Sequence, residues 1–416
     1  MARRAVAVAR HGKLPRRSPW TSVGKFVAAS LAVVLVSTSA VVAWAINDVV
    51  QTAPEGVTLA GETPGQVIPD INSIEGGANV LVIGSDSREG QGDGYGSHET
   101  AKLNDVTMLL HIAEDHSNAT VVSFPRDMYV PIPSCPKVDE NGKPTGENHY
   151  AMSSQKINTS LSYGGMACTV LTVEALTGLD IQYAAMVQFN GVIALSNAIG
   201  GVEVCLAESI KDSKTDLDLP AGNVSLKGKD ALQFLRTRHG VSDGSDLGRI
   251  SNQQLFLSAL VRDLKSAETL TDPVKLYSIA KVAATNMTFS TSLNNINTMV
   301  GLAKSLSEIP TDKITFVQYP NFYQGDGVAP LTSDAETLMD AIKADKNLSV
   351  TGGTGGSIPE DGEIGADTTE PPATTDPSAT EPPDSTEAPD DGTVELPDSI
   401  HGQNASQVTC ADGNGY

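Results

Sequence analysis

Arginine residues are concentrated in one short stretch of the chain, DALQFLRTRHGVSDGSDLGRISNQ, which covers residues 230–253. The stretch places Arg236, Arg238 and Arg249 beside two carboxylates, Asp243 and Asp246. The guanidinium group is a rigid fork of donors that fits phosphate with two hydrogen bonds. Such crowding in a chain of net charge -22 favours a site for a highly charged anion such as a diphosphate. The alternative is a set of solvated surface ion pairs.

The local backbone decides where these side chains point. Arg236 and Arg238 lie two positions apart, so they point to the same side if the segment is extended and diverge if it is helical. Gln253 lies four positions after Arg249, so on a helix both face the same side and can reach one ligand. We therefore include Gln253 among the candidate diphosphate contacts.

Two aspartates flank neighbouring strands. Asp86 follows the apolar strand expected over residues 79–84, and Asp105 precedes the strand expected over residues 106–112. In an antiparallel hairpin, both carboxylates would lie at one end of the sheet. Two carboxylates with a polyphosphate are a common holder for Mg2+, with Mn2+ as an alternative. Taken singly, each aspartate also fits a turn or cap role.

Two further arginines lie close to these strand ends. Arg126 occurs in SFPRD, where a proline ends the strand expected over residues 119–124. Beside Asp86 and Asp105 it is a candidate phosphate clamp rather than an ordinary ion pair. Arg88 follows Asp86 by two positions and is added to the candidate diphosphate contacts.

Other enzyme motifs in the chain are incomplete. Residues 240–244, GVSDG, match the G-x-S-x-G pattern of serine hydrolases, but no apolar strand precedes them and no helix directly follows. His98 and Glu99 lack the second histidine of a zinc-protease motif, and the sequence has no P-loop. The acidic composition also argues against nucleic-acid binding.

The N-terminal region predicts a membrane anchor. Residues 1–25 contain seven lysines and arginines, whereas residues 26–46 contain no charge. A helix of about 20 apolar residues spans the hydrocarbon core. Because flanking positive charges stay in the cytoplasm, we expect a single-pass cell-membrane protein whose N-terminus is cytoplasmic and whose main domain is extracellular. A cleavable signal peptide, with the A-x-A arrangement at residues 43–45, is the alternative.

The four cysteines lack C-x-x-C spacing, which favours disulfides in an oxidising compartment over zinc. Three pairings are open, and we favour Cys168 with Cys205 and Cys135 with Cys410. Residues 351–400 contain 13 Asp or Glu and no Lys or Arg, so we expect a disordered Pro/Thr/Asp/Glu-rich tail over residues 348–416. Cys410 is the one sign that the end folds back.

Strands and helices alternate between these ends. Strands are expected over residues 79–84, 106–112, 119–124, 183–189, 202–206 and 314–319. Helices are expected over residues 155–163, 169–176, 190–198, 229–234, 249–264, 273–284, 293–305 and 335–344. This order predicts one α/β domain, a three-layer αβα arrangement around a mixed sheet. The expected organisation is a cytoplasmic segment (1–25), a transmembrane helix (26–46), a linker (47–77), the extracytoplasmic domain (78–347) and the tail (348–416).

Several segments together resemble the LytR-CpsA-Psr family. They occur in the family's order over about residues 78–261 and read NVLVIGSDSR, NDVTMLLHI, VVSFPRDMYVPIP, KINTSLSYGG, FNGVIALSNAIGGVEVCL and ALQFLRTRHGVSDGSDLGRISNQQ. The cysteines in PIPSC, GMACT and VEVCL are similar to the actinobacterial branch. The resemblance implies a membrane-anchored catalytic domain that transfers a glycopolymer from an undecaprenyl, or polyprenyl, diphosphate carrier to a hydroxyl of peptidoglycan or another wall acceptor.

The resemblance also assigns roles. It implies Mg2+ coordination by Asp86 and Asp105, and diphosphate contacts by Arg126, Arg236, Arg238, Arg249 and Gln253. One position departs from the family pattern, because Leu103 stands where an arginine is usual; Lys102 is a candidate substitute that lacks the planar fork. The implied phosphoryl transfer releases lipid monophosphate and depends on positioning and charge, so the catalytic set is Asp86, Arg126, Arg236 and Arg238.

Two other functions stay open from sequence. One is hydrolysis of the polyprenyl diphosphate, and the other is non-catalytic binding or scaffolding of a lipid-linked glycan. A transcriptional regulator, suggested by the family's historical name, conflicts with export. The sequence does not identify the glycopolymer, the acceptor, the oligomeric state or the general base, for which Asp86 or a neighbouring carboxylate is a candidate.

Overall fold

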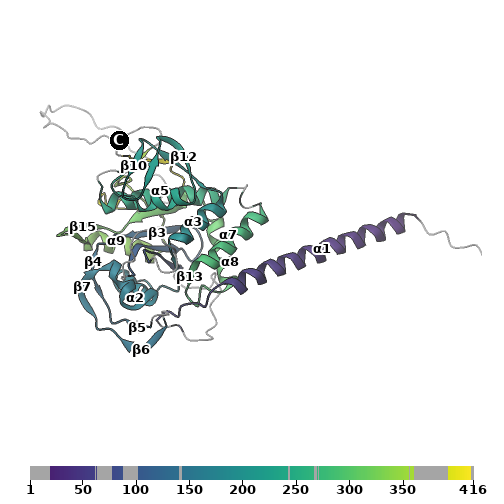
Figure 1. Cartoon of the computed structure of the whole chain (residues 1–416), viewed down its shortest axis with the longest axis horizontal. Coiled ribbons are helices and arrows are strands. Elements are labelled where there is room, and N and C mark those ends of the chain that lie inside the picture. Colours follow the sequence, from purple (N-terminus) through teal and green to yellow (C-terminus); the bar gives the residue numbers. More distant parts are fainter. Residues whose placement is uncertain are drawn as a thin grey trace, which may run out of the picture. The chain divides into compact units, whose positions relative to one another are not determined.

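The computed structural model describes residues 19–60, 62, 77–87, 102–139, 143–241, 244–266, 269, 271–355, 357–359 and 392–413. The chain divides into an N-terminal unit and an α/β unit that spans Thr52–Tyr416 (Figure 1). Helix α1 (Pro19–Thr52) is exposed and strongly apolar from Val23 onward, and it is long enough to cross a membrane. It contains the predicted span of residues 26–46 and extends beyond both of its ends.

A seven-stranded mixed sheet forms the centre of the α/β unit, in the order β13-β8-β1-β2-β3-β14-β20. Its strands are β1 (Ala78–Ser85), β2 (Asn104–Ile112), β3 (Ala119–Phe124), β8 (Tyr183–Val187), β13 (Met287–Phe289), β14 (Ile314–Gln318) and β20 (Gly402–Asn404). Strand β2 is antiparallel to β1 and β3, whereas β8 is parallel to β1 and β14 is parallel to β3. The carboxyl ends of β1, β3, β8 and β14 therefore meet at one edge with the amino end of β2.

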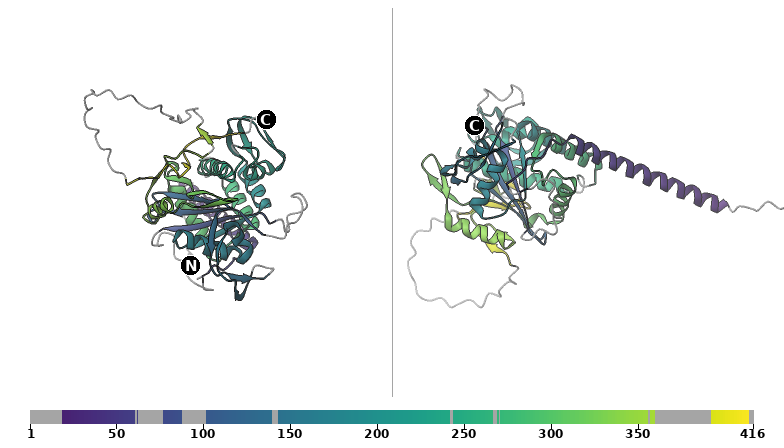
Figure 2. Two further views of the ribbon diagram at one scale, coloured as in Figure 1. Left: turned by 90° about the vertical axis from the view of Figure 1, so that its left-hand side faces the viewer. Right: turned by 90° about the horizontal axis from the view of Figure 1, so that it is seen from below.

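Helices cover both faces of this sheet (Figure 2). Alternate side chains of β1 point to opposite faces, so Leu81 packs with α2 (Ser160–Thr177) and α9 (Thr332–Lys343). Its neighbour Val80 belongs to the cluster on the other face. That cluster includes side chains of α5 (Asp246–Lys265), α7 (Pro273–Asn286) and α8 (Ile296–Glu308). The predicted three-layer αβα arrangement is confirmed.

Smaller elements surround the central layers. Helices α4 (Lys229–Arg236) and α5 pack on a four-stranded sheet of β12 (Gly222–Leu226), β9 (Val202–Leu206), β21 (Thr409–Ala411) and β18 (Ser357–Pro359), and α3 (Phe189–Ile199) lies against α4 and α7. The two-stranded pairs are β4 (Tyr129–Ile132) with β7 (Met152–Lys156), β5 (Pro136–Val138) with β6 (Pro144–Asn148), β10 (Ile210–Asp212) with β11 (Leu217–Leu219), β15 (Asn321–Gln324) with β16 (Gly327–Pro330), and β17 (Leu348–Ser349) with β19 (Val394–Glu395).

The predicted helix over residues 155–163 is wrong at its start. Residues 155 and 156 end β7, a 3-10 turn follows at Ile157–Thr159, and α2 begins at Ser160. Gly164 and Gly165 then depart from helical backbone angles and kink α2. A Cβ atom on Gly164 would lie 2.6 Å from the Pro136 carbonyl oxygen, so α2 can approach the start of β5 this closely only with glycine at position 164.

The predicted disulfide pairing is wrong. Cys135 is bonded to Cys168, and Cys205 is bonded to Cys410. The first bond forms because the kinked helix α2 packs on the loop after β4, which brings the two Cα atoms to 5.2 Å. The second forms because β21 pairs with β9 in a register that places Cys410 opposite Cys205. Neither juxtaposition has a local sequence signal.

The prediction of a disordered tail over residues 348–416 is also wrong for the part that the structure describes. Residues 392–413 return to the α/β unit, where β20 forms an edge of the central sheet and β21 joins β9. The predicted boundary of the domain at residue 347 therefore excludes folded chain. The linker prediction fails likewise at Leu59, which is buried in the core cluster under α2 and α9.

Candidate active site

The hairpin of β1 and β2 brings Asp86 and Asp105 to one edge of the sheet, as the sequence predicts. Ser85 pairs with Asn104, and a bulge in β2 leaves Asp105 at the strand's irregular end. The Asp86 amide donates to the Leu103 carbonyl at 3.1 Å, and the Leu103 amide donates to Asp86 Oδ1 at 2.8 Å. The backbone of Leu103 thus orients the Asp86 carboxylate, although the leucine side chain supplies no charge.

Arg126 meets Asp105 at this edge. It follows the carboxyl end of β3, and its Nη1 atom lies 2.5 Å from Asp105 Oδ1. Its Nε atom donates to Asp127 Oδ2 at 3.2 Å. The Asn158 amide donates to the Arg126 carbonyl at 3.2 Å, so the segment before α2 fixes the backbone of this loop. Arg126 therefore lies beside Asp105, one of the two predicted metal ligands.

Asp246 connects the separate arginines. It begins α5, and its Oδ1 atom lies 2.8 Å from Arg249 Nη2, 3.6 Å from Arg238 Nε and 3.8 Å from Arg126 Nε. Both carboxylate oxygens are buried, and neither makes a hydrogen bond of good geometry to the described residues. The sequence shows Asp246 beside the arginines, but it gives no reason to select it as the residue that joins them.

Arg249 is the most deeply buried of these arginines, with 4% of its side chain exposed. It donates from Nη2 to the Asp105 carbonyl at 2.9 Å, while its Nε atom is buried without a partner among the described residues. Burial lowers the pKa of the Arg249 guanidinium against the opposing charge of Asp246. Arginine stays protonated in proteins even so, which makes Arg249 a fixed positive charge behind the site.

Arg236 and Arg238 do not lie on a common extended strand. Arg236 ends α4, Thr237 is extended, and Arg238 then reaches Asp246. The guanidinium carbon of Arg236 lies 4.2 Å from the centre of the Phe189 ring, which follows the carboxyl end of β8. Both arginines are therefore held at the same edge of the sheet, but Arg236 packs on the Phe189 ring whereas Arg238 pairs with Asp246.

Gln253 is a buried residue that links helices α5 and α4. Its side chain is 3% exposed, and Nε2 donates to the Leu235 carbonyl at 3.0 Å. The contact ties α5 to the last turn of α4, next to Arg236. Its predicted contact with the diphosphate stays a prediction. Arg88 and Asp243 lie outside the described residues, and Lys102 is exposed before β2.

The carboxyl group of Asp105 is held in its charged form. Burial raises the pKa of this group, but the positive charges of Arg249 and Arg126 and the hydrogen bond from Arg126 outweigh it. The pKa therefore lies below its ordinary value. A charged Asp105 suits both an ion pair with arginine and coordination of a divalent cation.

Two buried asparagines next to these residues were not selected from sequence. Asn104 precedes Asp105 and donates from Nδ2 to Thr107 Oγ1 at 2.6 Å, while its Oδ1 atom has no partner in the described part of the chain. Asn158 Oδ1, beside the Arg126 loop, is likewise buried without one. Buried amide oxygens are normally satisfied, so these two atoms are unusual features beside Asp105 and Arg126.

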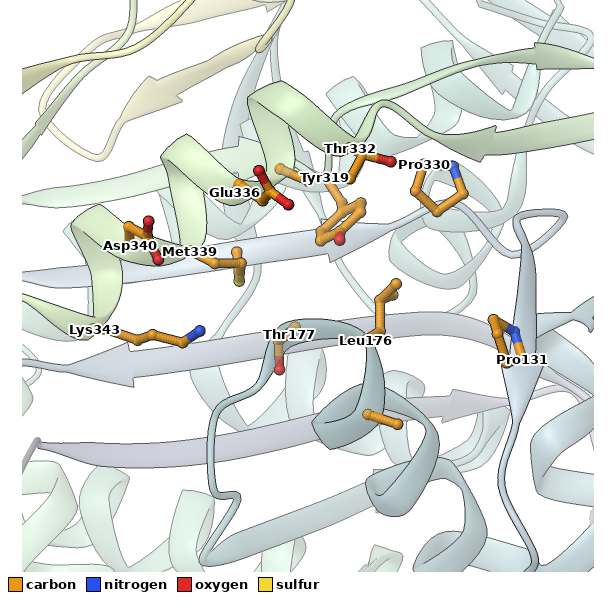
Figure 3. A pocket seen from close by; sticks show the side chains of 12 residues that line it. Pro131, Leu176, Thr177, Tyr319, Pro330, Thr332, Glu336, Met339, Asp340 and Lys343 are labelled. Atoms are coloured by element: carbon orange, nitrogen blue, oxygen red, sulfur yellow. The ribbon is translucent and has the colours of Figure 1, made fainter. Parts of the chain in front are cut away.

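A groove of about 390 Å³ opens near the same edge, between α2 and α9. Leu176 and Thr177 of α2 face Met339 and Lys343 of α9 across it (Figure 3). Tyr319 lines the groove where β14 ends, and its ring lies 5.0 Å from the ring of Phe124, two residues before Arg126. Tyr319 thus places one end of the groove at the carboxyl end of β14, and α9 lines the groove with both apolar and charged side chains, including Glu336, Asp340 and Lys343.

The LytR_cpsA_psr family model matches residues 50–346, which is most of the chain. The chain belongs to the LytR-CpsA-Psr family. Cell wall biosynthesis protein LcpA of Corynebacterium glutamicum is 31% identical to this family member over 303 residues, 66% of this chain and 58% of LcpA. The chain thus matches less than two thirds of that relative's length.

Further relatives agree with this assignment. The polyisoprenyl-teichoic acid–peptidoglycan teichoic acid transferase TagT of Bacillus subtilis is 26% identical over 304 residues, 71% of this chain and 86% of TagT. The LytR-Csp2A-Psr enzyme from Actinomyces oris has the same fold, with a TM-score of 0.52 and 20% identity over 70% of this chain and 96% of that chain.

Proposed function

We propose that this family member transfers a glycopolymer from a polyprenyl diphosphate carrier to a hydroxyl group of the cell wall. The observation that carries the proposal is the convergence of Arg126, Arg238 and Arg249 on Asp246 beside Asp105. Arginines from three separate segments meet there, which a solvated surface ion pair would not require. The names of the relatives LcpA and TagT, which refer to cell wall biosynthesis and teichoic acid transfer, support the same reaction class.

Charge balance favours a metal ion as part of the substrate complex. Ion pairs link three arginines with the three aspartates 105, 127 and 246, so this set has no net formal charge. A diphosphate needs additional positive charge there. Within the described residues, no three acidic, histidine or cysteine side chains converge on a metal position. Mg2+ is often held by only one or two carboxylates and substrate phosphates, so Asp86 and Asp105 fit its donor requirements.

The reaction that follows is an exchange at one phosphorus atom. The acceptor oxygen forms a bond to the phosphorus that carries the glycan, the bond to the bridging oxygen breaks, and lipid monophosphate leaves. The attacking hydroxyl group loses a proton, and Asp86 is our candidate for the base that takes up this proton. Arg126, Arg236 and Arg238 hold the phosphate oxygens as negative charge shifts toward the leaving group. When bound, Mg2+ would neutralise part of the same charge.

The groove between α2 and α9 is our candidate for the first isoprene units of the carrier. One end of it lies at Tyr319, after the carboxyl end of β14, and Leu176 and Met339 supply apolar walls. Helix α1 would hold the domain at the membrane surface that contains such carriers. We place the basic residues before α1 in the cytoplasm and the α/β unit outside.

Product analysis tests the proposal. The full chain in detergent is incubated with a labelled polyprenyl diphosphate glycan and Mg2+, with and without peptidoglycan. Transfer predicts that label moves to the wall acceptor and that lipid monophosphate appears in equal amount. Release without acceptor would instead indicate hydrolysis. Tight binding without any turnover would indicate a scaffold, and both outcomes contradict the proposal.

A further inference from the structure

We propose that residues 409–413, near the C-terminus, are a positioning element of the arginine site. These residues lie more than 60 positions beyond the end of the family match at residue 346. They contact the loop that carries Arg238 and the helix that carries Asp246 and Arg249. The predicted effect of residues 409–413 on turnover rests on the proposed function, whereas their predicted effect on the Arg238 loop does not.

Strand β21 is held inside the fold from both sides. It pairs in parallel with β9 and antiparallel with β18, so it is an interior strand of its sheet. The Ala207 amide donates to the Ala411 carbonyl at 2.9 Å, and the disulfide joins Cys410 to Cys205 of β9. The position of the C-terminal segment is thereby fixed relative to β9.

Gly413 extends this attachment to the arginine loop. It forms an isolated antiparallel bridge with Val241, which is 1% exposed and lies between Arg238 and Asp246 in the sequence. In the same loop, Thr237 Oγ1 donates to Asp212 Oδ2 at 2.6 Å. The loop is thus held by contacts with both β10 and the C-terminal residues.

The same segment also packs on α5. Ala411 belongs to the buried cluster that contains Leu255 and Phe256 of α5. Just before β21, Arg262 Nη1 donates to the carbonyl oxygens of Ala405 at 2.9 Å and Gln407 at 3.0 Å. The C-terminal segment therefore contacts both the loop that carries Arg238 and helix α5, which carries Asp246. Loss of this segment should shift Arg238 relative to Asp246.

Gly413 gives the sharpest test. A Cβ atom there would lie 2.5 Å from the Ser209 carbonyl oxygen, so Gly413→Ala should open the bridge to Val241 while Cys410 stays bonded to Cys205. A displacement of about 1 Å can reduce turnover by about a hundredfold, so we expect kcat to fall at least tenfold. The matched control is Val408→Ala, at the exposed residue just before this element, which should leave kcat within about twofold.

A deletion tests the whole element. The chain that ends at Val408 and carries Cys205→Ser lacks β21, and it is compared with a chain that ends at Gly413. We expect the shorter chain to lose turnover and the longer chain to keep it. A synthetic peptide of residues 405–416 with Cys410→Ser, added in excess, should restore part of the activity. Wild-type kcat in the shorter chain would overturn the proposal.

Hydrogen exchange separates this proposal from the catalytic one. Amides of residues 237–249 should exchange faster in the Gly413→Ala variant, whether or not the protein turns over a glycan carrier. If the wild type shows no transfer but these amides lose protection, the proposed function fails and the positioning role stands. Unchanged exchange in both the variant and the shorter chain would overturn the positioning role.

Discussion

Asp246 Oδ1 lies 2.8 Å from Arg249 Nη2, one helical turn apart at the start of α5, and both side chains are largely buried. This ion pair fixes the position of the Asp246 carboxylate, which Arg126 and Arg238 also approach. Because both Asp246 oxygens are buried without aligned donors, the carboxylate is held by charge more than by hydrogen bonds. We infer that Asp246 keeps the arginines in place before a phosphate binds.

Asp246→Asn should destabilise the fold. The substitution leaves Arg249 buried without its charged partner, so the free energy of unfolding should fall by about 3 kcal/mol. Urea denaturation of the unit that spans Thr52–Tyr416 measures the change. Asp218→Asn is the matched control, because that exposed carboxylate pairs with Lys211 on the surface and its loss should cost under about 1 kcal/mol. Equal effects of the two substitutions would contradict the role of Asp246.

Asp105 predicts a defined pH dependence of stability. Its pKa in the folded chain lies below the ordinary value of 3.8, since nearby arginines outweigh the effect of burial. The charged form therefore stabilises the fold above about pH 4, and this contribution is lost as the pH falls through the lowered pKa. The wild type should exceed Asp105→Asn in unfolding free energy at pH 7, and the difference should shrink toward pH 3. A difference that does not change between these pH values would refute the pKa direction.

The Cys135–Cys168 bond closes a loop with a sequence separation of 33 residues. Loop-closure entropy predicts that replacing both cysteines with alanine lowers the free energy of unfolding by about 3–4 kcal/mol. The comparison is made by urea denaturation under oxidising conditions, which keep the Cys205–Cys410 bond intact in both proteins. A loss below about 1 kcal/mol would show that the kinked helix α2 holds this loop without the bond.

The groove assignment predicts a chain-length effect. Leu176→Trp fills the groove, so KM should rise at least about tenfold for a long polyprenyl carrier and much less for a carrier with one or two isoprene units. Val274→Trp, at an exposed position of α7, is the matched control and should change neither value. Equal KM changes for short and long carriers would place the lipid elsewhere.

Much of this architecture could be predicted from sequence because the signals are local. The apolar run of β1, its partner β2 and the proline after β3 fix both the strands and the edge where Asp86, Asp105 and Arg126 meet. Helices α5, α7 and α9 also follow from periodicity and caps; Asp272, for example, accepts from the amides of Val274 and Lys275 at the start of α7.

The errors share a different cause. The disulfides, the return of β20 and β21 and the bridge from Gly413 to Val241 join residues far apart in sequence, and no periodicity encodes such pairings. The tail prediction failed because the acidic composition of residues 351–400 hid the short strands β18 and β19 within this segment and β20 and β21 after it. Asp246 was not selected because its role appears only once Arg126 and Arg238 arrive from other elements.

The most direct test is equilibrium binding of a short, soluble polyprenyl diphosphate to the unit that spans Thr52–Tyr416, measured by calorimetry with Mg2+. We predict that the diphosphate binds at least about tenfold more tightly than the matching monophosphate, and that Arg126→Ala or Arg238→Ala removes this preference. Lys343→Ala, which alters the far end of the groove, should retain it. Equal affinity for the two ligands, or undiminished preference in both arginine variants, would contradict a carrier diphosphate site at this edge of the sheet.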